Sequence, residues 1–146
     1  MKQKNQPAVL SYYGLYLLQY LKENHPDKAA DTDFIESRAD HAADVYEQSR
    51  LEGYTPEGTQ ELAMAALTEG LHFSKYNTII EVLWNEFADE VEPGNALAFA
   101  LTLQLEMEEV FARYPLTDNF AYTSEYDLLY TELTGAVATY LEEHGV

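Results

Sequence analysis

The chain has 146 residues, a length that predicts one domain over residues 1–146. Apolar residues make up 47% of the chain and charged residues 23%, which is ordinary globular usage and excludes disordered and fibrous proteins. The chain has no cysteine, so disulfides, thiolate zinc sites, iron–sulfur clusters and cysteine nucleophiles are excluded as well.

The charge is strongly negative and unevenly distributed. Eight basic and 26 acidic side chains give a net charge of −18. Residues 1–75 hold 7 basic and 12 acidic side chains, whereas residues 76–146 hold 14 acidic side chains and a single basic one, Arg113. Such a chain repels nucleic acid and anionic lipid, so we expect it to bind neither nucleic acid nor membranes directly. The expected partner is a protein that is basic or itself binds DNA; the alternative is an acidic surface that only maintains solubility.

The N-terminal segment has the outline of a signal peptide, because Lys2 and Lys4 precede an uncharged run over residues 5–21. That run contains polar residues and four tyrosines, and no A-x-A cleavage site follows it. It is also too short and too polar to span a membrane. We therefore expect a buried first helix over about residues 7–24 and a cytoplasmic protein.

Capping patterns bracket the next helices. The second is expected to begin at Asp33, with Glu36 completing a capping box, and to end at Gly53. The third is expected to begin with Thr55 as its N-cap, followed by a proline at the first helical position, and to end at Gly70.

The fourth helix is expected to be capped by Ser74, and the chain breaks at residues 93–94. Its inner face is expected to carry apolar residues that are three or four apart: Ile80, Leu83, Trp84 and Phe87.

The fifth helix, over about residues 95–112, starts within the uncharged stretch 93–105 and is apolar on more than one side, which is typical of a central helix packed by several neighbours. Thr123 or Ser124 is expected to cap a sixth helix with a clear amphipathic pattern. The predicted fold is all-α: a single compact multihelical domain of about six helices around a central apolar fifth helix.

The search for catalytic and metal motifs gives nothing that we can assign. Glu69 and His72 form one E-x-x-H pair, but a di-iron bundle needs two such pairs, and no other histidine has a glutamate three residues before it. Phosphate-loop, G-x-S-x-G, H-E-x-x-H and calcium-loop patterns are absent from the sequence. We therefore predict no catalytic residue, cofactor or metal. An enzyme with an unrecognised site stays open, and a pocket lined by His72 or His41 with buried tyrosines would favour it.

Three aromatic residues in a loop are candidates for partner binding: Tyr114, Phe120 and Tyr122. Loops lie on the surface and often carry contacts. The alternative is that these rings fold back and cover the core.

An array of carboxylates in the second half is the other candidate surface. Its members are expected on the fourth and fifth helices: Glu86, Asp89, Glu90, Glu92, Glu106, Glu108 and Glu109. A dense anionic surface can imitate the DNA phosphate backbone, which carries one charge per ~1.7 Å of duplex axis.

Six segments of the chain are distinctive: residues 10–13, 20–26, 69–76, 83–87, 110–115 and 130–135. Together they resemble a small family of uncharacterised acidic helical proteins, a domain of unknown function that occurs in Bacteroidetes-type bacteria, often on conjugative transposons. It implies a bacterial cytoplasmic setting and a link to mobile-element biology, and it assigns no catalytic residue.

Two functional hypotheses follow. The first is a non-catalytic protein-interaction module, with self-association as a homodimer through a helix face left open. The alternative is a nucleic-acid mimic, an anti-restriction or anti-repressor factor acting through the acidic second half. The two differ in salt dependence, because mimicry relies on charge and an apolar interface does not.

Overall fold

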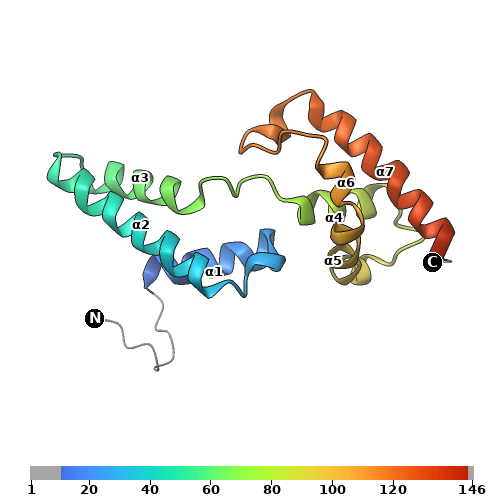
Figure 1. The fold of residues 1–146 in the computed structure, drawn as a ribbon, viewed down its shortest axis with the longest axis horizontal. Coiled ribbons are helices and arrows are strands. Elements are labelled where there is room, and N and C mark those ends of the chain that lie inside the picture. The colour runs from blue at the N-terminus through green and yellow to red at the C-terminus, as the bar shows by residue number, and fades with distance from the viewer. Residues whose placement is uncertain (1–10, 145–146) are drawn as a thin grey trace. The chain divides into compact units, whose positions relative to one another are not determined.

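The computed structural model describes residues 11–144, and within them the fold is all-α, with seven α-helices, three short 3₁₀ helices and no strand (Figure 1). This confirms the predicted fold class. In chain order the elements are α1 (Tyr12–Asn24), η1 (Pro26–Lys28), α2 (Thr32–Leu51), α3 (Pro56–Thr68), α4 (Lys75–Glu86), η2 (Pro93–Asn95), α5 (Ala96–Glu106), α6 (Glu108–Phe111), η3 (Phe120–Tyr122) and α7 (Glu125–His144). The predicted start of the first helix at residue 7 lies outside the described residues.

The described residues form two compact units. The first unit comprises residues 11–22 and 28–69, and the second comprises residues 23–27 and 70–144. Each unit is described separately below. The assignment of residues 1–146 to one domain stays a prediction.

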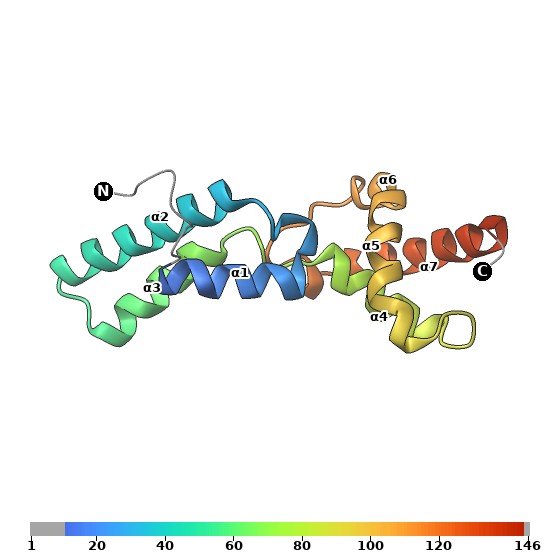
Figure 2. The ribbon, with the colours of Figure 1, turned by 90° about the horizontal axis from the view of Figure 1, so that it is seen from below.

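The first unit is built on α2 and α3, which run antiparallel beside each other (Figures 1 and 2). Small buried residues, Ala42 and Ala63 among them, lie on these helices and allow their backbones to approach closely. Gly53 has a φ of +96°, a conformation that glycine adopts without steric cost, and it ends α2 as predicted. The Tyr13 hydroxyl of α1 donates a hydrogen bond of 3.0 Å to Gln60 of α3.

The N-caps follow the sequence at two helices and differ at one. Thr55 and Ser74 cap α3 and α4 as predicted, since each hydroxyl accepts the N–H three residues further on, at 3.0 and 2.9 Å. The second helix is capped by Asp31 and not by Asp33, because the Asp31 carboxylate accepts the Phe34 N–H at 3.1 Å. Asp33 then lies in the first turn, where its charge is favourable near the positive end of the helix dipole.

Arg38 of α2 satisfies the C-terminal carbonyls of α3. Its guanidinium Nη1 donates to the carbonyl of Leu67 at 3.0 Å and to that of Glu69 at 2.8 Å. The same guanidinium lies 5.0 Å from the centre of the Phe34 ring. The last carbonyls of a helix have no partner within that helix, so this side chain supplies what α3 lacks and joins α2 to α3.

The second unit is organised around α4. This helix buries residues on most of its circumference, and it packs against both α5 and α7. The predicted inner residues Ile80, Leu83 and Phe87 are buried, whereas Trp84 is half exposed and its indole N–H points to the carbonyl of Pro93, with 3.5 Å between nitrogen and oxygen. α4 is therefore the element on which the core of this unit forms.

The predicted fifth helix is divided at Met107. Its backbone leaves helical geometry there, with φ −100° and ψ 10°, so α5 ends at Glu106 and α6 begins at Glu108. Met107 and Phe111 are both buried in the core. The turn between the two short helices thus keeps both of these side chains inside.

The loop between α6 and α7 is held by Asp118. Its carboxylate accepts the backbone N–H groups of Gly70 at 2.9 Å and His72 at 3.1 Å. Gly70 has a φ of +79°, so this turn needs a glycine. Two hydrogen bonds from one carboxylate fix the loop to the segment that leads into α4.

Within residues 11–144, no helix is both long enough and apolar enough to cross a lipid bilayer.

Removing the donors of Arg38 is expected to destabilise the protein. For Arg38→Met we expect the free energy of unfolding to fall by about 1–3 kcal/mol, because the carbonyls of Ala66, Leu67 and Glu69 lose a charged donor. Arg50→Met is the matched control, since Arg50 bonds a single carbonyl in an exposed turn, and it should cost less than about 1 kcal/mol. Urea unfolding followed by circular dichroism measures both. Equal losses would show that Arg38 has no capping role.

Candidate functional site

α5 is apolar on more than one side but is covered on one face only. Its buried face carries Ala96, Ala100, Leu103 and Gln104. Another face leaves three leucines in solvent, and their exposed fractions are 49% for Leu97, 43% for Leu101 and 77% for Leu105. Neighbouring elements therefore cover one face of α5 and not the several sides that the sequence analysis expected. We call the three exposed leucines the α5 stripe.

The α5 stripe is a regular feature of the helix. Its members are four residues apart, so they form one continuous row along the helix surface. At 1.5 Å per residue, the row is about 12 Å long. A single exposed leucine is ordinary, but a row of three is an unusual surface for a monomer to leave in water.

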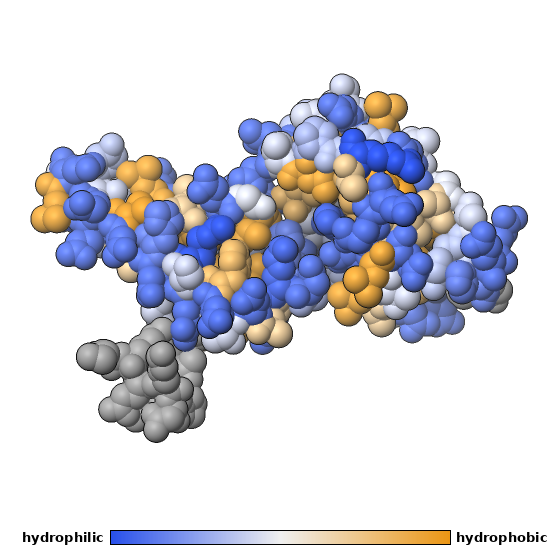
Figure 3. All heavy atoms as spheres, viewed as in Figure 1, coloured by the Kyte–Doolittle hydropathy of each residue, from blue (hydrophilic) through white to orange (hydrophobic). Residues whose placement is uncertain are grey.

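Carboxylates lie at the C-terminal end of the α5 stripe. Glu106, Glu108 and Glu109 follow it in sequence and are all exposed. Glu108 forms an ion pair with Lys75, with 3.1 Å between nitrogen and oxygen. Within the described residues, Glu106 and Glu109 have no cationic partner. On the face drawn in Figure 3, hydrophobic residues (orange) lie among hydrophilic ones (blue), including over the region of α5.

The other predicted carboxylates are also exposed, but they do not form one helical face. α4 ends at Glu86, so Asp89, Glu90 and Glu92 belong to the segment between α4 and η2. There the carbonyl of Phe87 accepts the N–H of Glu90 and that of Val91, which turns the chain. The prediction that Asp89, Glu90 and Glu92 lie along the fourth helix is therefore wrong. α4 ends at Glu86, and Phe87, its C-cap residue, is buried in the core.

The three loop aromatics have different environments. Phe120 is 1% exposed and packs edge-on against Phe73, with 5.3 Å between ring centres. Tyr114 is half-buried beside Phe120, and Tyr122 is 89% exposed. Phe120 thus packs within its own unit, as the alternative interpretation expected, and Tyr122 alone of the three offers a largely free ring.

Tyr114 takes part in a polar cluster with Glu132 and Arg113. The Tyr114 hydroxyl donates to one oxygen of Glu132, and the Arg113 guanidinium donates to the other at 2.6 Å. The hydrogen bond to Glu132 raises the pKa of Tyr114, and the same bond holds the pKa of Glu132 below its usual value. Arg113 is therefore already paired with a carboxylate of its own chain.

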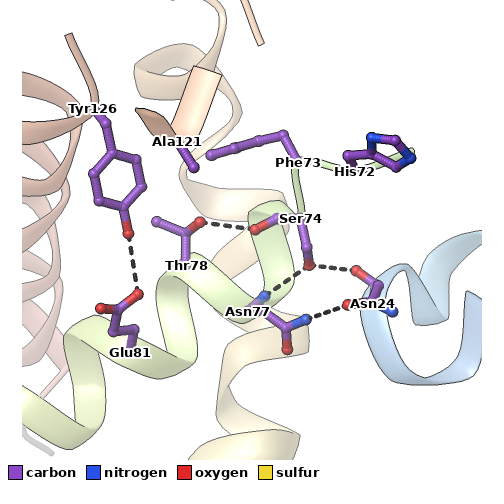
Figure 4. Close-up of a pocket in the computed structure, with 9 residues that line it drawn as sticks. All are labelled: Asn24, His72, Phe73, Ser74, Asn77, Thr78, Glu81, Ala121 and Tyr126. Atoms are coloured by element: carbon purple, nitrogen blue, oxygen red, sulfur yellow. Dashed lines mark hydrogen bonds between the residues drawn. The ribbon is translucent and has the colours of Figure 1, made fainter. Parts of the chain in front are cut away.

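The second unit also contains an open pocket of about 200 Å³. Its lining, shown in Figure 4, consists of Asn24, His72, Phe73, Ser74, Asn77, Thr78, Glu81, Ala121 and Tyr126. A pocket with His72 and a partly buried tyrosine is the feature that would favour an enzyme, and the hydrogen bonds of its polar groups decide whether it does. It is smaller than most ligand pockets, which measure about 300–1,000 Å³.

The hydroxyl groups of the pocket are engaged in structural hydrogen bonds. The Ser74 hydroxyl donates to the carbonyl of Asn24 while it caps α4. The Thr78 hydroxyl donates to the carbonyl of Ser74 at 2.8 Å. The ring of His72 points away from both hydroxyls (Figure 4). His72 is therefore not placed to activate Ser74 or Thr78 as a nucleophile.

Tyr126 and Glu81 form the other polar contact of the pocket. The Tyr126 hydroxyl donates to Glu81 at 3.0 Å (Figure 4). Burial first, and this hydrogen bond second, raise the pKa of Tyr126 to about 12. A phenol with so high a pKa stays protonated at neutral pH, where it acts as a donor.

A search of residues 11–144 for three or more His, Asp or Glu side chains arranged to hold a metal ion found no such group. The E-x-x-H pair is divided by the end of α3, since Glu69 is its C-cap and His72 follows in the turn. His72 lies instead beside Asp118, with 3.8 Å between nitrogen and oxygen.

Comparison with known proteins finds a family model that spans nearly the whole chain and a similar crystal structure. Residues 5–146 match the family described as a domain of unknown function, DUF1896. The chain is also similar to the crystal structure of protein PG0816 from Porphyromonas gingivalis, with 35% identity, 91% of each chain covered and a TM-score of 0.88. A comparison with curated proteins found no match.

The high pKa of Tyr126 predicts a loss of stability in alkali. The pKa in the folded protein, about 12, exceeds the ordinary value of 10, so the neutral phenol stabilises the fold fully below pH 10. This contribution is lost as the pH rises from about 10 to about 12. Thermal unfolding between pH 9 and 12 should therefore show a steeper fall in Tm for the wild type than for Tyr126→Phe. Tyr122→Phe should follow the wild type, and a Tyr126→Phe curve parallel to both would contradict the assignment.

Truncating the loop aromatics separates core from surface. Phe120→Ala should lower the free energy of unfolding by about 3–5 kcal/mol, because it empties a fully buried site. Tyr122→Ala should change it by less than about 0.5 kcal/mol. Chemical denaturation measures both variants, and similar losses for the two would contradict the environments described here.

Proposed function

The chain belongs to the DUF1896 family, and we propose that it is a non-catalytic protein-interaction module that binds its partner through the α5 stripe. One observation carries the proposal: three leucines in a continuous row, each at least 43% exposed, on a helix whose opposite side is buried. The engaged hydroxyls of the pocket supply no competing catalytic arrangement.

Burial of the α5 stripe provides the free energy for binding. Completely burying one leucine side chain is worth about 1.5–3 kcal/mol. The three leucines are already partly covered, so a partner that buries the rest of them gains a little less than twice that amount before the costs of association. Apolar residues at the centre of an interface, surrounded by polar groups, are the usual arrangement in protein complexes. The carboxylates after the stripe fit the role of such a polar border.

A nucleic-acid mimic is the second candidate function. It is favoured by the exposure of all seven predicted carboxylates and by the net charge of −18. We propose with it a link to mobile-element biology and a cytoplasmic location, which the family resemblance and the composition support. Salt dependence distinguishes the two functions, because an electrostatic mimic loses affinity as salt rises.

A capture experiment with matched variants tests the interaction module. The wild type, a Leu101→Gln/Leu105→Gln double variant and the control Leu128→Gln are immobilised, exposed to bacterial lysate and washed at low and then ~1 M salt. Leu128 is 61% exposed on α7, so its substitution removes an apolar side chain from elsewhere on the second unit. We expect a protein that survives the high-salt wash on the wild type and on Leu128→Gln, and that is lost from the double variant.

Two results would contradict the proposal. Retention of the same proteins on all three baits would exclude the α5 stripe as the binding surface. Release of every bound protein by salt, together with loss of capture in a Glu86→Gln/Glu90→Gln variant, would favour the mimic. A light-scattering mass twice that of the monomer, reduced to the monomer in the double leucine variant, would assign the α5 stripe to a homodimer.

A further inference from the structure

We infer that the α5 stripe receives a basic amphipathic helix of the partner, whose apolar row packs on Leu97, Leu101 and Leu105 and whose Lys or Arg side chains meet Glu106 and Glu109. This inference rests on the proposed function and names the chemistry of the partner. Shape and charge support it independently.

The shape of the α5 stripe favours a helix as its occupant. A row of side chains four residues apart forms a ridge, and the commonest helix packing inserts such a ridge into the matching groove of a second helix. The row is about 12 Å long, which corresponds to about two turns of a partner helix. Helices that dock in this way present apolar anchors at i, i+3 or i+4, and i+7.

The charge around the α5 stripe favours a basic occupant. Glu106 and Glu109 are exposed and have no cationic partner within residues 11–144. The lysine and arginine of the second unit, Lys75 and Arg113, are each paired with a carboxylate of the same unit, at 3.1 and 2.6 Å. This surface therefore offers carboxylates to an incoming helix and has no free lysine or arginine for an acidic one.

The same charge disfavours a second copy of this chain. Two copies meeting through their α5 stripes would bring together two bodies that each carry a net charge of −18, and in a parallel pairing Glu106 and Glu109 of each would lie near those of the other. Complementary charge directs encounter and excludes wrong partners, whereas like charge opposes it. The basic helix is thus the occupant that satisfies both the apolar row and its border.

Two synthetic peptides test this inference directly. Each is about 18 residues long, or five helical turns, with leucines in the same amphipathic positions; one has lysine at the remaining positions and the other glutamate. Fluorescence anisotropy measures the Kd of each peptide for the full-length wild type and four variants. The variants are Leu97→Gln, Leu101→Gln/Leu105→Gln, Glu106→Gln/Glu109→Gln and the control Leu128→Gln.

We expect the lysine peptide to bind the wild type and Leu128→Gln equally, and at least about tenfold more weakly to the double leucine variant, since about 1.4 kcal/mol of lost burial is one factor of ten in Kd. The Glu106→Gln/Glu109→Gln variant should also bind more weakly and show a smaller dependence on salt. The glutamate peptide should not bind. Thermal unfolding checks that the variants are folded, and Leu97→Gln replaces the double variant if that one is not.

Equal binding of the lysine peptide to all variants would overturn the inference, because it would show only attraction between opposite net charges. Binding of the glutamate peptide, or of neither peptide, would overturn it as well. If neither peptide binds while leucine-dependent capture from lysate persists, the proposed function stands and the partner chemistry is wrong. If leucine-dependent capture is also lost, the proposed function fails with it.

Discussion

The buried circumference of α4 is the constraint on which the second unit depends. This helix buries Tyr76, Ile79, Ile80, Val82 and Leu83, so it needs neighbours on more than one side, and α5 and α7 supply them. α5 can place only one face against that core, yet its sequence is apolar on more than one side. The exposed leucines of α5 therefore follow from the packing geometry: the residues in excess of one buried face remain in solvent.

Local signals in the sequence were sufficient for much of the secondary structure. Thr55 and Ser74 cap their helices as predicted. An N-cap depends on a side-chain oxygen directly before the first turn of a helix, and residue type and position in the sequence are enough to recognise it. The cap of α2 was misplaced from Asp31 to Asp33, since two nearby aspartates give the same signal. The break at Met107 was missed because it depends on burying Met107 and Phe111 together, a tertiary condition that periodicity does not contain.

The candidate site shows where sequence reasoning stops. Phe120 and Tyr122 are two residues apart in one loop, yet one is buried and the other is exposed, and residue type alone does not separate them. Leu97, Leu101 and Leu105 are visible in the sequence as a row, but an uncharged helix is equally consistent with a row covered by neighbours. Whether the row is covered or exposed depends on how many helices pack against α5, and only the tertiary structure shows that number.

Solvent relaxation of leucine methyl signals in NMR measures whether the α5 stripe is exposed to water in solution. A soluble gadolinium chelate broadens the signals of methyl groups that it can approach. We expect strong broadening for Leu97, Leu101 and Leu105, comparable with that of exposed Leu128, and little for buried Leu103. Protection of the three stripe leucines equal to that of Leu103, in dilute protein without a partner, would show that the α5 stripe is covered and is not a free binding surface.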